Sequence, residues 1–316
     1  MNKFQIVMLL NLFLFSCCFS NSEVYKILYY NSLIPADIEL RNRVLTTVCC
    51  DDCCDLSRVA DAGKVITQND ATDYQLMHNG IKILKDCYYG AWMTVIIELL
   101  KGHHEPQEEK AFNEILEYIP DNAVMLELGS YWGYYSMWFQ QKISGAKNFL
   151  IEPDPKNIII GQKNFKLNAM QGYFIQAMIG AYSSDLEAFI DWDHNKHEIK
   201  QICIDDFANE NNIPFIDILH SDIQGAEIDM LKGCQRLIAQ RRIGYFVIST
   251  HRGVHQDCLK ILEEANFDII LSITREESFS ADGLIIAKLP EINGPSYIDI
   301  SRRTPQFCSL IDGVIK

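Results

Sequence analysis

The spacing of apolar residues along the chain changes near residue 107. Before that point the periodicity is weak, and only Leu40–Val48 and Met93–Leu100 have the spacing expected of helices. After it, short apolar runs alternate with segments whose apolar residues recur every three or four positions. We therefore expect helices at 107–118, 134–143, 156–168, 226–237 and 256–265, and strands at 123–128, 147–151, 172–177, 215–219, 244–249, 267–273 and 283–287.

This alternation predicts an α/β fold. Parallel strands need crossover connections, so the pattern predicts a doubly wound, mostly parallel sheet with helices on both faces and an N-terminal helical appendage. The last two strands have no helix between them and are expected to pair antiparallel at one edge. Residues 187–206 predict a strand or hairpin insertion. Residues 289–316 contain several prolines and predict a partly irregular tail.

The chain begins with one lysine and an almost uninterrupted apolar run, residues 4–19. A short positive start and a short apolar core are typical of a signal peptide or signal anchor. A buried N-terminal helix or strand, or a lipoprotein signal ending at Cys17, are alternatives. We therefore divide the chain into a signal segment (1–22), an appendage (23–99), a main domain (100–288) and a tail (289–316). Membrane contact is expected through residues 4–19 only.

Charge and cysteine content narrow the function. There are 28 Lys and Arg against 42 Asp and Glu, so the net charge is 28 − 42 = −14. That field repels phosphate backbones and makes nucleic acid a poor candidate partner. Four of the 11 cysteines lie between Cys49 and Cys54. They suit an incomplete metal knuckle or a redox pair, but we favour a surface loop whose thiols pair locally if the protein is exported.

A glycine-rich turn is the most informative segment. The strand at 123–128 carries Glu127 near its end, and Gly129, Ser130 and Gly133 follow in a Gly-x-x-x-Gly pattern before a helix. The glycines allow a tight turn and close approach of a ligand at the carboxyl edge of the sheet. The spacing differs from those of a Walker loop and of a dinucleotide fingerprint, which disfavours an NAD-dependent oxidoreductase. Glu127 suits a ligand that carries an ammonium and a sulfonium.

Acids follow two further strands. Glu152, before Pro153, ends the next strand, and one carboxylate there can accept both hydroxyls of a ribose. Asp222 follows the strand at 215–219, and Glu227 lies in the first turn of the next helix. Asp222 as a helix cap and Glu227 as a favourable charge at a helix start are simpler alternatives. Together with the glycine turn, the acids predict a nucleoside site.

These motifs, together with Ile204-Asp205-Asp206-Phe207 and the run from Asp222 to Glu227, resemble the FkbM family of S-adenosylmethionine-dependent methyltransferases over about residues 100–288. The resemblance implies a Rossmann-like class I methyltransferase fold, S-adenosyl-L-methionine as cofactor, and methylation mostly of oxygen on small molecules or glycans. The family often has Asp where Glu127 stands. It often has Lys where this chain has His220.

Our leading hypothesis is methyl transfer from S-adenosyl-L-methionine to an acceptor hydroxyl. We expect Glu127, Gly129, Ser130, Gly133, Glu152, Pro153 and Asp222 to bind the cofactor. Asp222 or His251 would accept the proton, His251 because an imidazole with a pKa near ~6.5 suits a general base; a hydrogen-bonded loop histidine is the simpler alternative for it.

Two questions stay open at this stage. Contiguous His103-His104-Glu105 can chelate a metal only if the side chains converge, so we interpret this segment mainly as a charged helix start and predict no metal. The signal segment suggests export or membrane attachment, whereas the methyl donor is a cytosolic metabolite. A catalytically inactive, exported or surface-anchored binding module is therefore the second hypothesis.

Overall fold

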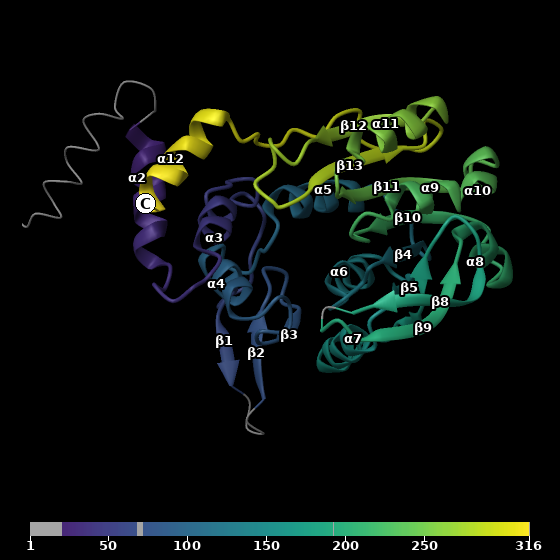
Figure 1. The fold of residues 1–316 in the computed structure, drawn as a ribbon, viewed down its shortest axis with the longest axis horizontal. Helices are drawn as coiled ribbons and strands as arrows, with labels where there is room; N and C mark the ends of the chain where they lie inside the picture. The colour runs from purple at the N-terminus through teal and green to yellow at the C-terminus, as the bar shows by residue number, and fades with distance from the viewer. Residues whose placement is uncertain (1–20, 68–71, 192, 316) are drawn as a thin grey trace, which may run out of the picture.

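The computed structural model describes residues 21–315, except 68–71 and 192. A sheet covered by helices forms one part of the molecule, and a smaller appendage lies beside it (Figure 1). The signal segment predicted for residues 1–22 falls almost entirely outside the described residues. None of the helices in the described part of the chain has the length and hydropathy of a membrane span.

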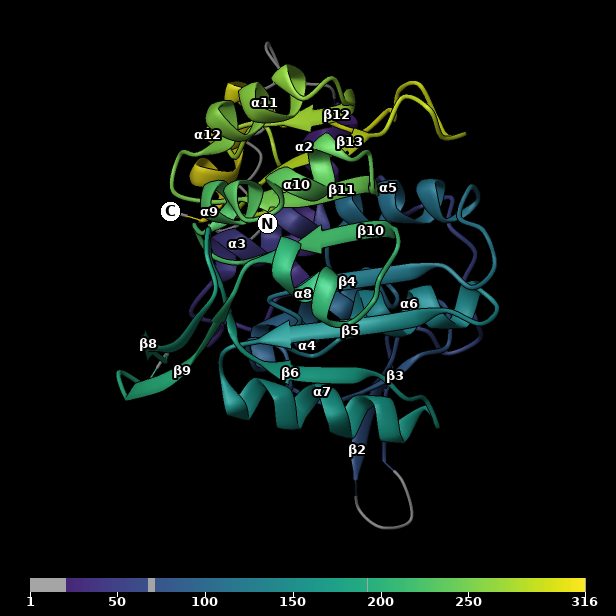
Figure 2. The same cartoon turned by 90° about the vertical axis from the view of Figure 1, so that its right-hand side faces the viewer.

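A seven-stranded sheet forms the centre of the larger part (Figure 2). In spatial order its strands are β12 (Asp268–Ile273), β13 (Gly283–Lys288), β11 (Ile243–Thr250), β10 (Ile216–Ser221), β4 (Val124–Leu128), β5 (Lys147–Glu152) and β6 (Tyr173–Gln176). The pairs from β11 to β6 are parallel, and β13 runs antiparallel to both of its neighbours. This confirms the predicted doubly wound, Rossmann-like sheet and its antiparallel edge.

Both faces of the sheet are covered because alternate residues of a strand point to opposite sides. Met125 and Ile218 belong to one core cluster, whereas their neighbours Leu126 and Leu219 belong to the other. The first face packs against α5 (Pro106–Leu116), α6 (Tyr134–Lys142) and α7 (Pro155–Leu167). The second packs against α8 (Ile204–Glu210), α9 (Glu227–Lys232), α10 (Gln235–Ala239) and α11 (His255–Glu264).

The single helix predicted for residues 226–237 is wrong, since two short helices, α9 and α10, replace it. The chain bends at Gly233, where a Cβ atom would lie 2.4 Å from the carbonyl oxygen of Gly180. Asp205, from the family-like motif, then accepts hydrogen bonds from the backbone N–H groups of Arg236 and Leu237 at 2.8 and 2.9 Å. A carboxylate remote in sequence thus caps α10 and favours the break.

The insertion predicted between residues 187 and 206 is a hairpin. β8 (Ser184–Ile190) and β9 (Lys196–Ile202) pair antiparallel, and β7 (Met178–Ile179) adds a parallel strand on the other side of β9. The hairpin stands out from the main sheet near the carboxyl end of β6 (Figure 2). That position brings it to the ligand-binding edge.

We had predicted a helical appendage, but the appendage also contains a small sheet. It contains α2 (Asn21–Leu33), α3 (Arg41–Val48), α4 (Ala91–Leu99) and an antiparallel sheet of β1 (Val65–Thr67), β2 (Asp73–Leu76) and β3 (Lys82–Leu84). The C-terminal tail also ends in a helix, α12 (Pro305–Ile315), which packs against α2 and α3. The two ends of the described chain therefore meet in the appendage (Figure 1).

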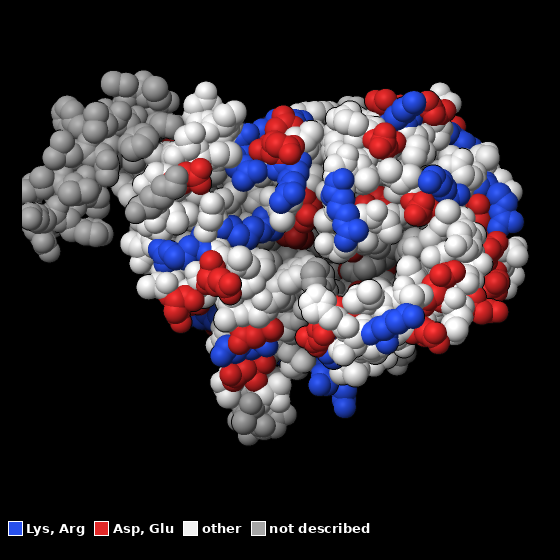
Figure 3. Space-filling model, viewed as in Figure 1, with Lys and Arg blue, Asp and Glu red and all other residues white. Residues whose placement is uncertain are grey.

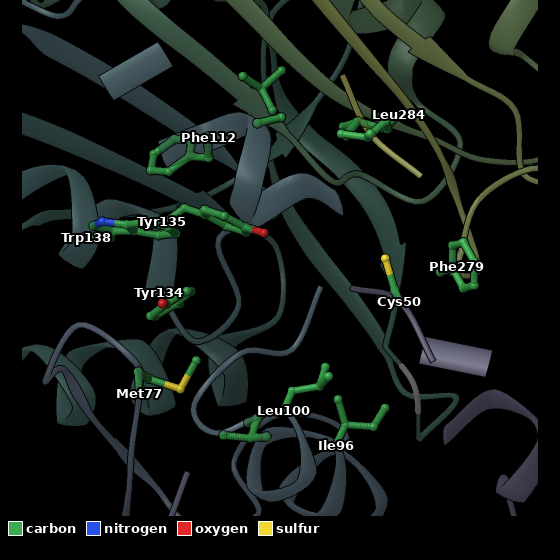
Figure 4. Packing of buried hydrophobic residues seen from close by; sticks show 14 of the residues in the cluster. Cys50, Met77, Ile96, Leu100, Phe112, Tyr134, Tyr135, Trp138, Phe279 and Leu284 are labelled. Carbon is green, nitrogen blue, oxygen red and sulfur yellow. The ribbon is translucent and has the colours of Figure 1, made fainter. Parts of the chain in front are cut away.

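One apolar cluster joins the appendage to the main domain (Figure 4). Met77, Ile96 and Leu100 come from the appendage side and belong to the same cluster as Phe112 of α5 and Trp138 of α6. The domain boundary near residue 100 stays a prediction. Across it, packing is continuous.

The cysteine-rich segment after α3 is mostly buried. Cys49, Cys50 and Cys53 are buried and Cys54 is exposed, and no described cysteine forms a disulfide. The predicted surface loop with locally paired thiols is therefore wrong for three of the four cysteines. Packing of the appendage against α5 covers them: the Cys53 thiol lies 3.2 Å from the carbonyl oxygen of Pro106.

Candidate active site

A cavity of about 530 Å³ lies where β4, β5 and β10 end. The turns after these strands form its floor, the hairpin contributes Phe189 and Ile190, and the appendage contributes Tyr88 and Tyr89. Both acidic and basic side chains border a hollow near the middle of the face in Figure 3. The cavity occupies the carboxyl edge of the sheet, where ligands bind in open α/β folds.

The turn from β4 to α6 brings the backbone close to the cavity. Gly129 has a φ of +72°, and a Cβ atom there would lie 1.9 Å from the carbonyl oxygen of Asp222. Gly133 has a φ of +73° and precedes α6. The Ser130 hydroxyl is buried and has no hydrogen-bond partner among the described residues. The structure therefore places all three predicted turn residues together, with one polar group free for a ligand.

Glu127 is buried at the floor of the cavity. Its Oε2 accepts a hydrogen bond from the backbone N–H of Ser136 at 3.1 Å. Burial raises the pKa of its carboxyl to about 7, although the charge of His220 and the bond from Ser136 oppose the shift. A carboxylate held at this cost in a nearly dry site favours a cationic ligand group.

Glu152 is also buried and already has partners. Its Oε2 accepts from the backbone N–H of Tyr131 at 3.0 Å, and its Oε1 accepts from Asp154 and Asn157 at 2.9 and 3.2 Å. Burial raises the pKa of Glu152 to about 7 against these bonds. Because an oxygen of a carboxylate has two lone pairs, Oε2 keeps one for a ribose hydroxyl. Pro153 lines the same part of the cavity.

Asp222, directly after β10, and His251, directly after β11, are in contact. Nε2 of His251 is 3.2 Å from Asp222 and 3.1 Å from Asp282, and its Nδ1 is 2.7 Å from Glu227. Burial alone would lower the pKa of His251, but hydrogen bonds to the three carboxylates raise it to about 12. The ring is a cation at neutral pH, which argues against the predicted base role. Asp222 lines the cavity and stays the candidate base.

The sequence analysis missed Glu108. This α5 residue lines the cavity, and its Oε1 lies 2.7 Å from Nε2 of His220, while its Oε2 accepts from the Ser249 hydroxyl at 2.9 Å. Burial acts to lower the pKa of His220, but the bond to Glu108 and the charges of Glu108 and Glu127 raise it. These contacts favour the protonated form of His220, at the position where the resembling family often has lysine. The pairing of His220 with Glu108 becomes visible only in the folded structure, where α5 reaches β10.

An aromatic wall was also missed. The rings of Tyr88 and Trp132 stack with centroids 4.4 Å apart, and Tyr131 packs edge-on against both Tyr88 and Tyr89. All four residues line the cavity. The sequence did not indicate a role for Tyr88 and Tyr89, because the appendage brings them over the glycine turn from a distant part of the chain.

Acidic groups dominate the lining of the cavity. Beside the polar and aromatic residues described above, Asp154, Asp191 and Asp229 add negative charge, while Arg252 and His220 are basic. Low-dielectric walls lined by one sign of charge favour ligands of the other sign. The cavity therefore suits a cationic ligand with a nucleoside part.

Comparison with protein families gives a match to the methyltransferase FkbM domain over residues 120–269. The chain carries an FkbM methyltransferase domain. The matched segment contains the glycine turn, Glu152, Asp222 and His251, so the resemblance stated from the motifs is confirmed. The comparison with curated proteins found no matching relative.

Solved structures with a similar arrangement include several methyltransferases. TrmK of M. capricolum, in complex with S-adenosyl-homocysteine, is 16% identical, with a TM-score of 0.38 over 58% of this chain and 69% of its own. Precorrin-6y C5,15-methyltransferase of Geobacter metallireducens is 12% identical, with a TM-score of 0.38 over 57% and 86%. The ribosomal protein L11 methylase of Lactobacillus delbrueckii subsp. bulgaricus is 14% identical, with a TM-score of 0.36 over 60% and 81%. Similarity at this level carries no information about the substrate.

The FkbM methyltransferase domain implies S-adenosyl-L-methionine as cofactor. The residues present fit this group. Glu127 offers a buried carboxylate to an ammonium, Glu152 keeps a lone pair for a ribose hydroxyl, and Gly129 leaves no side chain in the way. Which of the predicted residues contact the cofactor stays a prediction.

Proposed function

We propose that the FkbM domain transfers a methyl group to a hydroxyl of a small molecule or glycan. The observation that carries the proposal is the acidic cavity at the carboxyl edge, which holds three buried or half-buried carboxylates beside a glycine turn. S-adenosyl-L-methionine, when bound, would supply an electrophilic methyl group on a sulfonium. Transfer to a hydroxyl then needs positioning and a place for the proton.

The chain's own residues divide these tasks. Glu127 and the turn at Gly129 would hold the amino-acid part of the cofactor, and Glu152 its ribose. Asp222 would accept the proton that an acceptor hydroxyl loses, a role supported by its position in the lining of the cavity and its partial exposure. His251, held as a cation 3.2 Å away, fixes the Asp222 carboxylate in place.

The aromatic wall supports a hydroxylated acceptor. Tyr88, Tyr131 and Trp132 bring aromatic groups to the lining of the cavity, and Glu105 and Glu108 belong to the same lining. Binding sites of this kind combine apolar contact area with a few polar groups that fix orientation. Sugar rings and hydroxylated ring compounds match this combination, since one face of each is apolar and its hydroxyls can donate to carboxylates.

The proposal is tested with the full chain in two steps. Calorimetry should show saturable, one-site binding of S-adenosyl-L-methionine. Transfer of labelled methyl to a panel of monosaccharides, oligosaccharides and phenols should then give an O-methyl product, with the position determined by NMR. We expect Asp222→Asn to lower kcat by about 100-fold, within the usual range for removing a positioned base.

Asp257→Asn is the matched control, because Asp257 is exposed on α11 and outside the cavity lining. It should leave kcat unchanged. Absence of donor binding by the folded chain would overturn the proposal. Donor binding without transfer to any hydroxyl in the panel would favour the binding-module hypothesis instead.

A further inference from the structure

A second group of polar side chains lies buried behind α5, outside the lining of the cavity. Cys53, His103 and Glu109 each offer one ligand atom, and these atoms all lie within 4.8 Å of one another. All three residues are buried, His103 and Glu109 completely. The predicted charged helix start is confirmed, since α5 begins at Pro106 with Glu108 and Glu109 in its first turn, but both contiguous histidines also converge on Glu109.

The orientation of Glu109 is fixed by one of its two oxygens. Its Oε1 accepts from the backbone N–H of His104 at 2.7 Å and from that of Glu105 at 3.3 Å, and it lies 2.6 Å from Nδ1 of His104. Its Oε2 faces the other way, 2.5 Å from Nδ1 of His103 and 3.8 Å from Nε2 of His78. Oε2 is therefore the oxygen presented to the rest of the group.

His78 shows the arrangement expected of a metal ligand. Its Nδ1 lies 3.2 Å from the carbonyl oxygen of Ser57, which fixes the ring with a proton on that nitrogen. Nε2 is then a bare acceptor, buried without a hydrogen-bond partner among the described residues, as is Nε2 of His103. Histidines that bind a metal through one nitrogen commonly donate the N–H of the other to a backbone carbonyl, which is the bond that His78 makes to Ser57.

We propose that Cys53, His103 and Glu109 bind a zinc ion, with His78 as the fourth ligand. Thiolate, imidazole and carboxylate are the ligands that zinc combines in tetrahedral sites. Ligand atoms around tetrahedral zinc lie roughly 3.3–3.8 Å apart, given bonds of about 2.0–2.3 Å. Binding would therefore widen the 2.5 Å separation of His103 Nδ1 from Glu109 Oε2 and turn the His103 ring out of its stack with His78. Binding would release the Cys53 proton and balance the charges of the thiolate and Glu109.

The proposed ion would join three segments of the chain. Cys53 follows α3, His78 follows β2, His103 precedes α5 and Glu109 lies in α5. It would hold the appendage against the first helix of the catalytic part. The proposal does not depend on the methyl acceptor, and its test needs no activity measurement.

Metal content gives the first test. The full chain, purified without chelators from zinc-supplemented cells, should contain about one zinc per molecule by mass spectrometry. Cys53→Ser combined with His103→Ala should reduce this to background. Cys54→Ser is the matched control, because Cys54 lies in the same segment but is exposed, and it should leave the zinc content unchanged.

Cobalt substitution gives a test that does not rely on a folded double variant. Wild-type chain stripped of metal and titrated with Co²⁺ should develop a thiolate-to-cobalt charge-transfer band and the intense visible bands of a tetrahedral ion, both abolished by added zinc. A folded wild-type chain that binds no Co²⁺ would overturn the proposal. A tetrahedral spectrum that persists unchanged in Cys53→Ser would also overturn it.

Discussion

Glu127 illustrates at the scale of one residue how the site is prepared for a cation. Burial raises the pKa of its carboxyl from 4.5 to about 7, so near neutral pH the group is only partly ionised before a ligand binds. A cationic ligand binds the ionised form, so binding and loss of the Glu127 proton are coupled. The affinity for the cofactor should therefore depend on pH through the ionisation of Glu127.

We expect the affinity for S-adenosyl-L-methionine to rise between pH 6 and pH 8. With a pKa of about 7, about a tenth of Glu127 is ionised at pH 6 and most of it at pH 8, which predicts a change of about tenfold in Kd. Glu152 has a pKa of about 7 for the same reason and adds to the trend. Calorimetry across this range measures it. Glu117→Gln, at an exposed position after α5, should preserve the trend, and a Kd independent of pH would contradict it.

The same residue should oppose folding stability. Since the folded-state pKa of Glu127 is raised, ionisation destabilises the ligand-free protein as pH rises from about 4.5 to 7. Glu127→Gln should therefore increase the free energy of unfolding at pH 8 by up to about 3 kcal/mol, at about 1.4 kcal/mol per pKa unit, and by little at pH 4.5. Urea unfolding at both pH values checks this. Equal stabilisation at both values would argue against the buried charge as its cause.

Individual residues also show where sequence alone was insufficient. Asp222, Glu127 and Glu152 could be placed at the edge of the sheet because each lies at the end of an apolar strand or directly after it. The state of His251 could not be predicted, because Asp282 reaches it from a different strand connection. Three carboxylates around one ring change a candidate base into a fixed cation.

At the scale of the elements, the turns after β4 and β10 touch through their backbones. A Cβ atom on Gly129 would lie 1.9 Å from the carbonyl oxygen of Asp222, so the two turns would have to separate. We expect Gly129→Ala to weaken binding of S-adenosyl-L-methionine at least tenfold. It should also destabilise the fold by about 1–3 kcal/mol, the usual cost of local backbone strain. Calorimetry and urea unfolding measure the two effects.

Gly253→Ala is the control that distinguishes the effect of backbone strain from that of the collision between the two turns. Gly253 has a φ of +79°, close to the +72° of Gly129, but nothing lies within 4 Å of the position of its Cβ. It should show the cost of a left-handed alanine without the loss of affinity. Equal effects of both substitutions on Kd would show that contact between the two turns is unimportant.

Most elements of the main domain could be predicted, and most of the appendage could not. Long amphipathic helices and buried strands alternate clearly after residue 107. By contrast, β1 and β3 have three residues each, too few for a period to be visible. The break between α9 and α10 depends on Asp205, whose capping contact lies about 30 residues away in sequence.

At the scale of the whole molecule, a single apolar cluster extends from Ile27 of α2 to Ile311 of α12. Ile96 of α4 is fully buried in this cluster together with Phe112 and Tyr134 of the main domain. We expect the chain to unfold in one cooperative transition. Ile96→Ala should lower its free energy of unfolding by about 2–5 kcal/mol, as large-to-small substitutions in a core do.

Near-UV circular dichroism, which reports aromatic side chains of both parts, among them Trp92 of the appendage and Trp132 and Trp138 of the main domain, should show the same midpoint as far-UV circular dichroism. Val59→Ala is the control, because Val59 is 41% exposed in the appendage and should change stability little. Two separate transitions, of which Ile96→Ala lowers the midpoint of only one, would show that the appendage folds independently.

The buried group around Glu109 could not be predicted from the sequence, because its members come from segments that are far apart in the chain. Contiguous His103 and His104 lack the spacing of a metal motif, and Cys53 and His78 lie 56 and 31 residues before Glu109. Only the packing of the appendage on α5 brings them together. The nucleoside site could be predicted without such a contact, because neighbouring parallel strands bring their ends together by topology.

Two consecutive residues of α5 point in different directions, and each contacts a different histidine. Glu108 contacts His220 in the cavity, while Glu109 contacts His103 behind the helix. Side chains of adjacent helical residues are about 100° apart, so a small rotation of α5 moves both carboxylates at once. If a metal and the methyl donor both favour one orientation of this helix, each must tighten binding of the other by the same factor. One turn of helix would then make methylation responsive to metal supply.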